Sequence, residues 1–487
     1  MPKQPLTIYW CRCEFRMLDN PALFHATEYA SEKQTQFLPV SFLDTDLVES
    51  NWMNIGTNRR LLLAKILGEY SKNFKSFHIQ TGEVSDFFER IGQEYELTVF
   101  ANNDGDPYSR RRFKKIHDIL KKHNCELKII EDYFSINKDL VSGSGNIYSV
   151  FSPLRNASID TFLSSQTLPK PDLTRLNYLH LSDSLPISDI YQHIQKPNIL
   201  EYGEDYTLNL DELLPESNLQ SWFITEDSCL QHFETYTKNS IITYKKDRDS
   251  LEKDSLSYTS TSKMSQALKW GLVSSRTLKD IILKYHPKPK SDENLFQYIS
   301  ELIWREFYRY ILWHNPNVLD TEFQPKYRST IQWISGVEAQ HRFKSWILGK
   351  TGYPLVDAAM NQIAQTGWMH NRARMMVASI LTKNLGIDWR WGQDYFRRVL
   401  VDFDEASNNG GWQWAASVGS DPKPIRIFNP YIQAETHDKN KKYQSKWLPR
   451  DYDFTKKPIV EHRQARDEAL KRYNLSGSKE GMAIRDF

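Results

Sequence analysis

Three residues near position 300 combine groups that could hold a flat, polar ligand. Glu301, Trp304 and Arg305 are spaced so that a helix would place a carboxylate, an indole ring and a guanidinium group on one face. An ion pair at the protein surface beside a half-buried tryptophan has the same spacing. Taken alone, this stretch therefore fits either a ligand site or a surface ion pair.

A second stretch repeats the spacing with other groups. Asn371, Arg374 and Met375 would share one helix face and present an amide, a guanidinium group and a soft apolar side chain. A plain amphipathic helix does not need such a mixture twice, so the repetition favours a binding site.

Two carboxylates stand close to a pair of glycines further along the chain. Asp402 and Asp404 precede the segment 408–414, which reads Asn-Asn-Gly-Gly-Trp-Gln-Trp. Because glycine allows positive φ and close backbone approach, we expect a turn here that could cradle a flat ligand. The carboxylates suit ribose hydroxyls or a guanidinium group such as that of Arg374. A loop whose acids cap a helix is the alternative.

The segment 259–265, Thr-Ser-Thr-Ser-Lys-Met-Ser, is expected to open a helix. Hydroxyls and free N–H groups at a helix start bind phosphate well, although a cap without a ligand is commoner. No cluster of His, Cys and Asp has the spacing of metal ligands, so no metal is expected.

The first 155 residues alternate between strand and helix patterns. Strands are expected at 7–10, 37–43, 76–79, 97–101 and 127–130, and helices at 61–70 and 110–123. Such alternation predicts a doubly wound parallel sheet, whose ligands lie beyond the carboxyl ends of its strands. Residues 156–240 are rich in Ser and Pro, then in acids, and are interpreted as an interdomain connection with short helices.

From about residue 260 the pattern is helical. Helices are expected at 264–285, 295–313, 338–349, 355–365, 368–384 and 391–401, with stops at Gly352, Gly386 and the pair Gly410-Gly411. The predicted fold class is thus α/β plus all-α, divided into 1–155, 156–240 and 241–487.

The composition is that of a globular protein with many aromatic residues. Apolar residues make up 40% and charged residues 25%, and no apolar run is long enough for a transmembrane helix. Nine of the 14 tryptophans lie between positions 304 and 414, which suits flat ligands, base stacking or electron hopping. The net charge is +7 over residues 301–487 and −5 over residues 1–300, which favours a polyanionic partner for the C-terminal part. Four cysteines make no disulfide framework, so a reducing cytosol is expected.

Six motifs follow one another along the chain: Thr261-Ser-x-x-Ser265, Glu301-Leu-Ile-Trp-Arg-Glu-Phe307, Thr351-Gly-Tyr-Pro-Leu-Val-Asp-Ala-Ala-Met360, Gly367-Trp-Met-His-Asn-Arg-x-Arg-Met375, Asn408-Asn-Gly-Gly-Trp-Gln-Trp414 and Arg426-Ile-Phe-Asn-Pro430. Together they resemble the DNA photolyase/cryptochrome family, and the resemblance covers nearly the whole chain. It implies an N-terminal α/β antenna domain joined to a C-terminal helical domain that holds FAD in a bent conformation.

The resemblance also implies which side chains contact the cofactor. Asn408 would face the flavin N5 atom, and Asp402 would pair with Arg374. Trp412, Trp389 and Trp333 would carry electrons to the flavin. The full set implied to bind FAD is Tyr244, Thr261, Ser262, Lys263, Met264, Ser265, Tyr298, Arg305, Arg374, Asp402, Asp404 and Asn408.

The branch of the family is implied by the residues that would meet a substrate. Five of them match relatives that repair cyclobutane pyrimidine dimers in DNA by electron transfer from excited reduced FAD: Glu301, Asn371, Met375, Trp304 and Trp414. The two tryptophans would wall a pocket for a flipped dimer, and Arg372 and Arg426 would meet DNA phosphates. A blue-light receptor without repair activity and a (6-4) photolyase are the alternatives. Met375 disfavours the latter, and the early end of the chain disfavours the former.

A second chromophore is implied by the loop Asp104-Gly-Asp-Pro-Tyr-Ser-Arg110. It resembles the loop of relatives with a deazaflavin or flavin antenna, whereas the pair expected for folate is replaced by Tyr108-Ser109. A deazaflavin or flavin, or an empty site, is therefore expected over folate. We further expect a monomer in the cytoplasm, nucleoid-associated in a prokaryote, that acts on UV-damaged DNA without a membrane.

Overall fold

The computed structural model describes residues 3–44, 56–194, 197–202, 206–214, 222–256, 260–420 and 425–474, without the side chains of 254–256. Thr259, the first residue of the hydroxyl-rich segment, lies outside these ranges. No helix within them is both long and apolar enough to cross a membrane.

A parallel sheet forms the centre of the N-terminal domain. Its order is β3-β2-β1-β4-β5, and β6 pairs with β2. In β1, Leu6, Ile8 and Trp10 pack on one face and Tyr9 and Cys11 on the other, as the two-residue period of a strand requires. The strands are β1 (Gln4–Cys11), β2 (Gln36–Asp44), β3 (His78–Gly82), β4 (Tyr95–Asn102), β5 (Glu126–Ile130) and β6 (Asn177–Tyr178).

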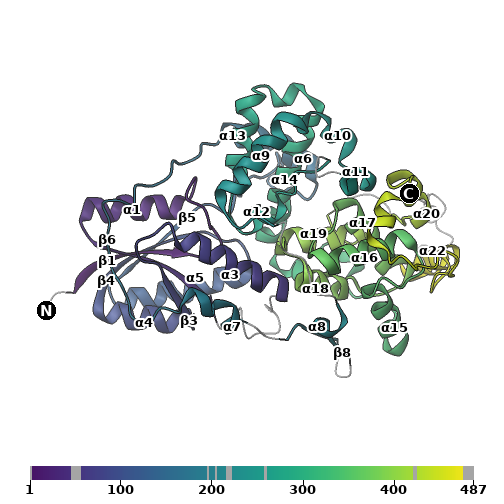
Figure 1. Ribbon diagram of the computed structural model, residues 1–487, viewed down its shortest axis with the longest axis horizontal. Coiled ribbons are helices and arrows are strands. Elements are labelled where there is room, and N and C mark those ends of the chain that lie inside the picture. Colours follow the sequence, from purple (N-terminus) through teal and green to yellow (C-terminus); the bar gives the residue numbers. More distant parts are fainter. Residues whose placement is uncertain are drawn as a thin grey trace.

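Helices cover both faces of this sheet (Figure 1). Side chains of α1 (Pro21–Lys33) and α3 (Thr57–Ser71) join the apolar cluster around Tyr9. Those of α4 (Val84–Glu94) and α5 (Pro107–Lys122) join the cluster around Trp10. The doubly wound sheet is therefore confirmed. The sequence pattern does not predict α1 and α4, although Asn20 caps α1 and proline follows it, a typical start signal.

The connecting segment holds more helix than expected. Two of its helices, α6 and α9, have 14 residues each, and they pack against α14 and α13 of the helical domain. Besides β6, the elements of this region are α6 (Phe151–Ser164), η1 (Ile187–Asp189), α7 (Ile190–Ile194), β7 (Ile199–Glu201), β8 (Thr207–Asn209), α8 (Leu210–Leu213) and α9 (Glu226–Asn239).

The C-terminal part is helical, as expected. Its main helices are α10 (Tyr244–Asp247), α11 (Leu251–Leu256), α12 (Ser265–Lys269), α13 (Ser275–Tyr285), α14 (Glu293–His314), α15 (Gly336–Ile347), α16 (Pro354–Thr366), α17 (Asn371–Ser379), α18 (Trp389–Val399), α19 (Glu405–Ala415), α20 (Pro430–His437), α21 (Lys442–Trp447) and α22 (His462–Arg472). The shorter turns are η2 (Ile241–Thr243), η3 (Pro289–Ser291), η4 (Pro316–Leu319), η5 (Pro325–Tyr327) and the π-helical η6 (Ile380–Asn384).

Two glycines allow close contacts between distant elements and correct the expected pattern. Gly271 has φ +55° and lies between α12 and α13, so the helix expected at 264–285 is interrupted. A Cβ at this position would lie 2.2 Å from the carbonyl oxygen of Cys13 in the N-terminal domain, so glycine is needed for this close contact. The expected turn at Gly410 is wrong, because the residue lies inside α19. A Cβ at Gly410 would lie 2.0 Å from the Tyr308 ring, so this glycine allows α19 to approach α14.

Candidate functional site

Three helices carry the two mixed faces and the tryptophan-rich segment. Helix α14 holds Glu301, Trp304 and Arg305, α17 holds the second mixed face, and α19 holds the segment 408–414. Helix α19 packs against both α14 and α17, and the three lie together in the middle of the helical domain (Figure 1). Local sequence fixes where α14 begins, since Asp292 accepts hydrogen bonds from the backbone N–H groups of Asn294 and Leu295.

Arg374 and Asp402 form the ion pair that the sequence suggested. Arg374 Nη2 lies 2.8 Å from Asp402 Oδ2, and Arg374 Nε donates to the carbonyl oxygen of Met369 at 2.7 Å. The Asp402 side chain is 2% exposed, and its Oδ1 has no hydrogen-bond partner among the described residues. A buried acceptor left open beside a guanidinium group fits a polar ligand such as the flavin that the family resemblance implies.

Hydroxyl side chains gather where phosphates were expected. Ser262 Oγ lies 2.7 Å from the Tyr298 hydroxyl, whose ring packs against Tyr244 at 5.0 Å between centroids. Lys263 has φ +55° and places its ammonium group 4.5 Å from the centre of the Trp368 ring. Met264 and Ser262 are buried, Thr261 is half-buried and Ser265 is exposed. The buried Ser260 hydroxyl has no partner among the described residues, so this segment also fits a phosphate-bearing group.

Glu301 is held by two polar neighbours. Gln297 Nε2 donates to Glu301 Oε1 at 2.7 Å, and Arg248 forms a close ion pair with the same oxygen. The next residue, Asp249, pairs with Arg372 at 2.8 Å. Burial would raise the pKa of Asp249, but the Arg372 guanidinium group outweighs it and lowers that pKa. Adjacent residues 248 and 249 therefore link Glu301 to Arg372.

The remaining predicted substrate-facing residues have separate partners. Asn371 Nδ2 lies 3.7 Å from Met375 Sδ, so the amide and the thioether meet on one face of α17. Trp304 stacks on Phe151 with 3.7 Å between ring centres and 8° between planes. Trp414 packs near Phe428, and the guanidinium group of Arg426 lies 4.9 Å from the centre of its ring.

The three tryptophans expected to carry electrons share one apolar cluster. Trp389 and Trp412 are fully buried there, and Trp333 packs against it half-buried. The Trp412 ring lies against Gly392, one turn after Trp389 on α18. Trp389 Nε1 donates to Glu322 at 3.3 Å. Exposure thus increases toward Trp333, which suits a path between the core and the surface.

A cavity of about 240 Å³ lies where the two domains meet. Residues following the ends of β1, β4 and β5 line it from the N-terminal domain, as the doubly wound topology predicts. From the antenna loop, Asp104 and Asp106 line this cavity, whereas Tyr108 bonds Asp44 at 2.7 Å and lines another hollow.

Two residues expected to contact FAD, Arg305 and Asp404, also line this cavity. Burial and the nearby Arg309 lower the pKa of Arg305 to about 10. Burial would raise the pKa of Asp404, but Arg309, 3.3 Å away, and Arg305 hold it well below its usual range. Asn408, the residue implied to face the flavin N5 atom, is not among the residues that line this cavity. Its side-chain amide donates to the backbone oxygen of Gln393 at 3.1 Å.

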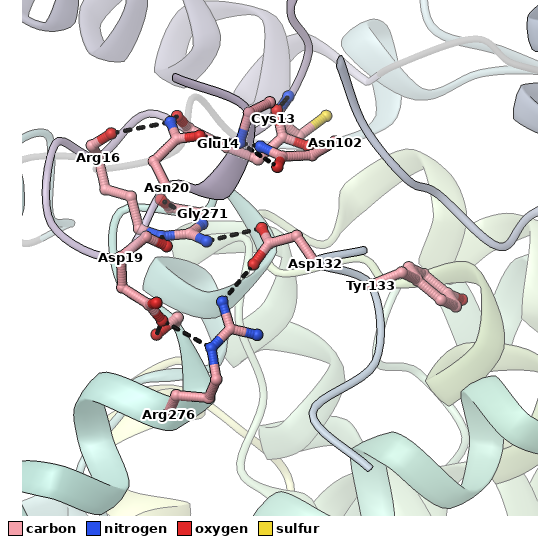
Figure 2. Close-up of polar contacts among 12 residues, drawn as sticks. Cys13, Glu14, Arg16, Asp19, Asn20, Asn102, Asp132, Tyr133, Gly271 and Arg276 are labelled. Carbon is pink, nitrogen blue, oxygen red and sulfur yellow. Dashed lines mark hydrogen bonds and ion pairs between the residues drawn. The ribbon is translucent and has the colours of Figure 1, made fainter. Parts of the chain in front are cut away.

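A buried charge network joins the two domains beside the cavity, and three of its members line it. Figure 2 shows Asp132 between Arg16 and Arg276, at 2.6 and 2.5 Å. Arg276, from α13, also pairs with Asp19 at 2.9 Å. All four side chains are less than a tenth exposed, so the network fixes how the domains meet.

Asp106→Asn is expected to stabilise the protein at neutral pH. Burial and the neighbouring Asp104 raise the pKa of Asp106 to about 6, above its ordinary 3.8. The folded state therefore binds the Asp106 proton more tightly than the unfolded state does. The free energy of unfolding should fall as pH rises from about 4 to about 6 and stay lower at higher pH, by at most about 3 kcal/mol. Asparagine still caps α5, where Asp106 accepts from the Ser109 N–H at 2.9 Å.

Thermal unfolding at several pH values tests this expectation. The melting temperature of the Asp106→Asn variant should exceed that of the wild type at about pH 8, and the gap should close toward about pH 4. Asp118→Asn, at an exposed position on the same helix, is the matched control. A gap that is equal at both pH values would contradict the raised pKa.

Two family models match the chain: DNA photolyase over residues 7–172 and the FAD binding domain of DNA photolyase over residues 298–480. A deoxyribodipyrimidine photo-lyase from Synechococcus sp. is 32% identical over 452 residues, which cover 91% of this chain and 87% of that protein. The chain belongs to the photolyase/cryptochrome family. The FAD-binding domain of the family is therefore present.

Solved structures of photolyase/cryptochrome proteins share the fold. The archaeal photolyase from Sulfolobus tokodaii, described with two FAD molecules, is 24% identical and superposes with a TM-score of 0.78 over 96% of this chain and 99% of that one. The cryptochrome of Synechocystis sp. PCC6803 is 22% identical, with a TM-score of 0.76 over 98% and 95% of the two chains. Membership of the family therefore leaves repair and signalling to be decided by the site.

Several residues of the site lie outside the sequence motifs. Arg248 and Asp249 lie in a charged run after Tyr244, which reads as a solvated surface. Phe151 belongs to an apolar stretch whose stacking on Trp304 bridges distant parts of the chain. Arg59 lines the interdomain cavity, and only the general rule about strand ends indicates its neighbourhood.

Proposed function

We propose that this protein is a deoxyribodipyrimidine photo-lyase, which repairs cyclobutane pyrimidine dimers in DNA under blue or near-ultraviolet light. One observation carries the proposal: Asn371 and Met375 meet on a helix face that also bears Arg374, the partner of Asp402. The groups that we propose to recognise the lesion would therefore lie next to the ion pair that we propose to bind the cofactor. Met375, rather than a histidine, favours a cyclobutane dimer over a (6-4) lesion.

The residues of the cofactor site would hold FAD by complementary polar contacts. When bound and reduced, FAD would supply an electron in light and recover it after the two carbon–carbon bonds of the dimer break. Arg374 and Asp402 would orient the flavin ring, and the open Asp402 Oδ1 would accept a hydrogen bond from it. The hydroxyl segment 261–265 would hold the phosphates with Tyr298 and Tyr244.

The dimer would be held by flat walls and one carboxylate. Phe151 fixes the plane of Trp304 by stacking, and Trp414 would form the facing wall, with stacking worth about 1–3 kcal/mol per base. Glu301, kept in place by Gln297 and Arg248, would accept hydrogen bonds from a thymine edge. Flipping out a damaged dimer costs only a few kcal/mol, which such contacts can offset.

Asp249→Asn is expected to strengthen DNA binding severalfold. Asp249 occupies the guanidinium group of Arg372 in the free protein, so a DNA phosphate must displace it. Arg372→Gln should instead weaken binding to all sequences and reduce the slope of log affinity against log salt by about 1. Fluorescence anisotropy of labelled dimer-containing DNA at several salt concentrations measures both effects.

Asp183→Asn, which removes an acid paired with Arg90 in the N-terminal domain, is the control for Asp249→Asn and should leave affinity unchanged. If Asp249→Asn weakened binding, Asp249 would support the DNA surface rather than compete with DNA for Arg372.

We also propose that the interdomain cavity holds a second chromophore, a flavin or deazaflavin. The antenna-loop carboxylates Asp104 and Asp106 line it, which agrees with the loop resemblance. The cavity reaches Arg305 and Asp404, two residues proposed to bind FAD. A pigment there would lie beside the FAD, close enough to transfer excitation energy to it.

Repair of a defined substrate tests the proposed function. Illuminated, reduced protein should restore the ultraviolet absorbance of thymine in oligo(dT) that carries cyclobutane dimers, and should not do so in the dark. An oligonucleotide with a (6-4) photoproduct should remain unchanged. Flavin-loaded protein that repairs neither substrate would instead be a blue-light receptor.

A further inference from the structure

Trp389, the middle tryptophan of the expected electron path, has its indole N–H group bonded to a buried carboxylate. Trp389 Nε1 donates to Glu322 Oε1 at 3.3 Å, and the two residues are 0% and 4% exposed. A carboxylate stabilises positive charge on a donor more than a neutral oxygen does, because hydrogen bonds to charged groups are the stronger ones. The contact therefore favours the loss of an electron from Trp389.

A cation and a second carboxylate also lie beside Trp389. The guanidinium carbon of Arg390 lies 4.6 Å from the centre of the Trp389 ring, where its charge opposes oxidation of the ring. Arg390 is paired with Glu322 at 2.9 Å and with Asp388 at 3.0 Å, so two carboxylates offset its charge. Arg328 donates to the backbone oxygen of Glu322, but it is exposed and water screens it. The charges around Trp389 thus still favour its oxidation.

Two other buried indoles have no such carboxylate on their N–H groups. Trp412 Nε1 has no hydrogen-bond partner in the part of the chain that the structure describes, and Trp346 Nε1 donates to the carbonyl oxygen of Val377 at 3.1 Å. The Trp346 ring lies 6.1 Å from the Trp412 ring, centre to centre, so Trp346 is near enough to give Trp412 an electron. Proximity alone therefore does not select Trp389, and the carboxylate distinguishes the two donors.

The loop that carries Glu322 is fixed to the helix that carries Trp412. Gln413, the next residue on α19, donates through Nε2 to the carbonyl oxygen of Thr321 at 3.1 Å. Its Oε1 accepts from the backbone N–H of Phe323 at 2.7 Å. Both neighbours of Glu322 are thus held by one side chain of α19, so the position of the carboxylate relative to Trp412 is set by the fold.

We propose that the Glu322 carboxylate selects Trp389, rather than Trp346, as the residue that gives an electron to oxidised Trp412. The inference rests on the expected electron path and not on dimer repair. In light, oxidised FAD takes one electron from Trp412, and one electron from Trp389 then restores Trp412 and leaves the positive charge on Trp389. The proton stays on Trp389 Nε1 in its bond to Glu322. A thiol in the solution replaces the lost electron by way of Trp333.

Flash photolysis of the protein with oxidised FAD tests the role of the charge without DNA. Glu322→Gln keeps an oxygen acceptor of the same reach but removes the charge. It should lower the yield of long-lived oxidised tryptophan at least about fivefold, because the electron returns to Trp412 before Trp389 can supply one. Glu322→Asp keeps the charge and should retain a higher yield than Glu322→Gln. Asp320→Asn, which removes an exposed carboxylate from the same loop, is the matched control and should leave the yield unchanged.

Variants of the tryptophans test the same selection without altering Glu322. Trp389→Phe should lower the yield at least as much as Glu322→Gln does, whereas Trp346→Phe should leave it unchanged. Melting temperatures show whether each variant is folded. The indole N–H signal of Trp389 in ¹⁵N-labelled protein, assigned with Trp389→Phe, should move in Glu322→Gln, which reports the hydrogen bond independently of light.

Three results would overturn the inference: a wild-type yield in Glu322→Gln, equal yields in Glu322→Gln and Glu322→Asp, or equal losses in Trp346→Phe and Trp389→Phe. Repair by chemically reduced protein needs no electron from a tryptophan, so Glu322→Gln should then repair dimers as the wild type does. Absence of repair in both proteins would contradict the proposed function and leave the selection of Trp389 standing.

Discussion

Replacing Arg374 by methionine is expected to destabilise the folded protein by about 3–5 kcal/mol and to release its FAD. The change leaves the Asp402 carboxylate buried without its cation, since that side chain is 2% exposed. It also removes the hydrogen bond to the Met369 carbonyl. Flavin content after gel filtration and the melting temperature measure the two effects.

A double variant separates the lost ion pair from lost packing. Asp402→Asn removes the charge that Arg374→Met strands, so the two changes together should cost clearly less than the sum of the single changes. Arg90→Met, which breaks an exposed ion pair with Asp183, should cost no more than about 1 kcal/mol. If Arg374→Met behaved like Arg90→Met, the ion pair would not support the cofactor site.

Glu301→Ala is expected to lower the yield of dimer repair per absorbed photon about tenfold, with FAD still bound. The carboxylate is proposed to meet the dimer, and a hydrogen bond involving a charged group contributes about 1.5–3 kcal/mol. Arg248→Gln should lower repair less, because Gln297 still holds Glu301. Repair yield under limiting light, measured with saturating DNA, compares the variants.

The control for this experiment lies on the same helix. Glu293→Ala removes an exposed carboxylate in the first turn of α14 that pairs with Lys245, and it should repair as the wild type does. Loss of FAD from Glu301→Ala would assign Glu301 to the cofactor instead of the dimer. Equal repair by Glu301→Ala and wild type would remove it from the site.

Periodic patterns predict the fold well because they reflect burial. The alternation in β1 and the three-to-four residue spacing in α14 each follow from one buried face, and both elements extend slightly beyond the predicted ranges. Helix α1 is not predicted because its buried face is mostly alanine with one threonine, which marks an apolar face weakly. Gly410 in α19 misleads because glycine permits close packing on Tyr308 as readily as it permits a turn.

The site is predictable only where its residues stand close in sequence. The faces of α14 and α17 follow from helical spacing, whereas the Arg374–Asp402 pair is implied by the family resemblance. Arg59 on α3 and Arg397 on α18 both lie over the Phe403 ring although they are more than three hundred residues apart, so spacing cannot reveal this contact. Such contacts depend on how the two domains meet.

The fluorescence lifetime of reduced FAD in the protein tests the central claim most directly. DNA that contains a cyclobutane dimer should shorten this lifetime, because under the proposed function an electron would pass from the excited cofactor to a dimer lying between Trp304 and Trp414. The same DNA without a dimer should leave the lifetime unchanged. Dimer-containing DNA that binds without shortening the lifetime would contradict light-driven repair at this site.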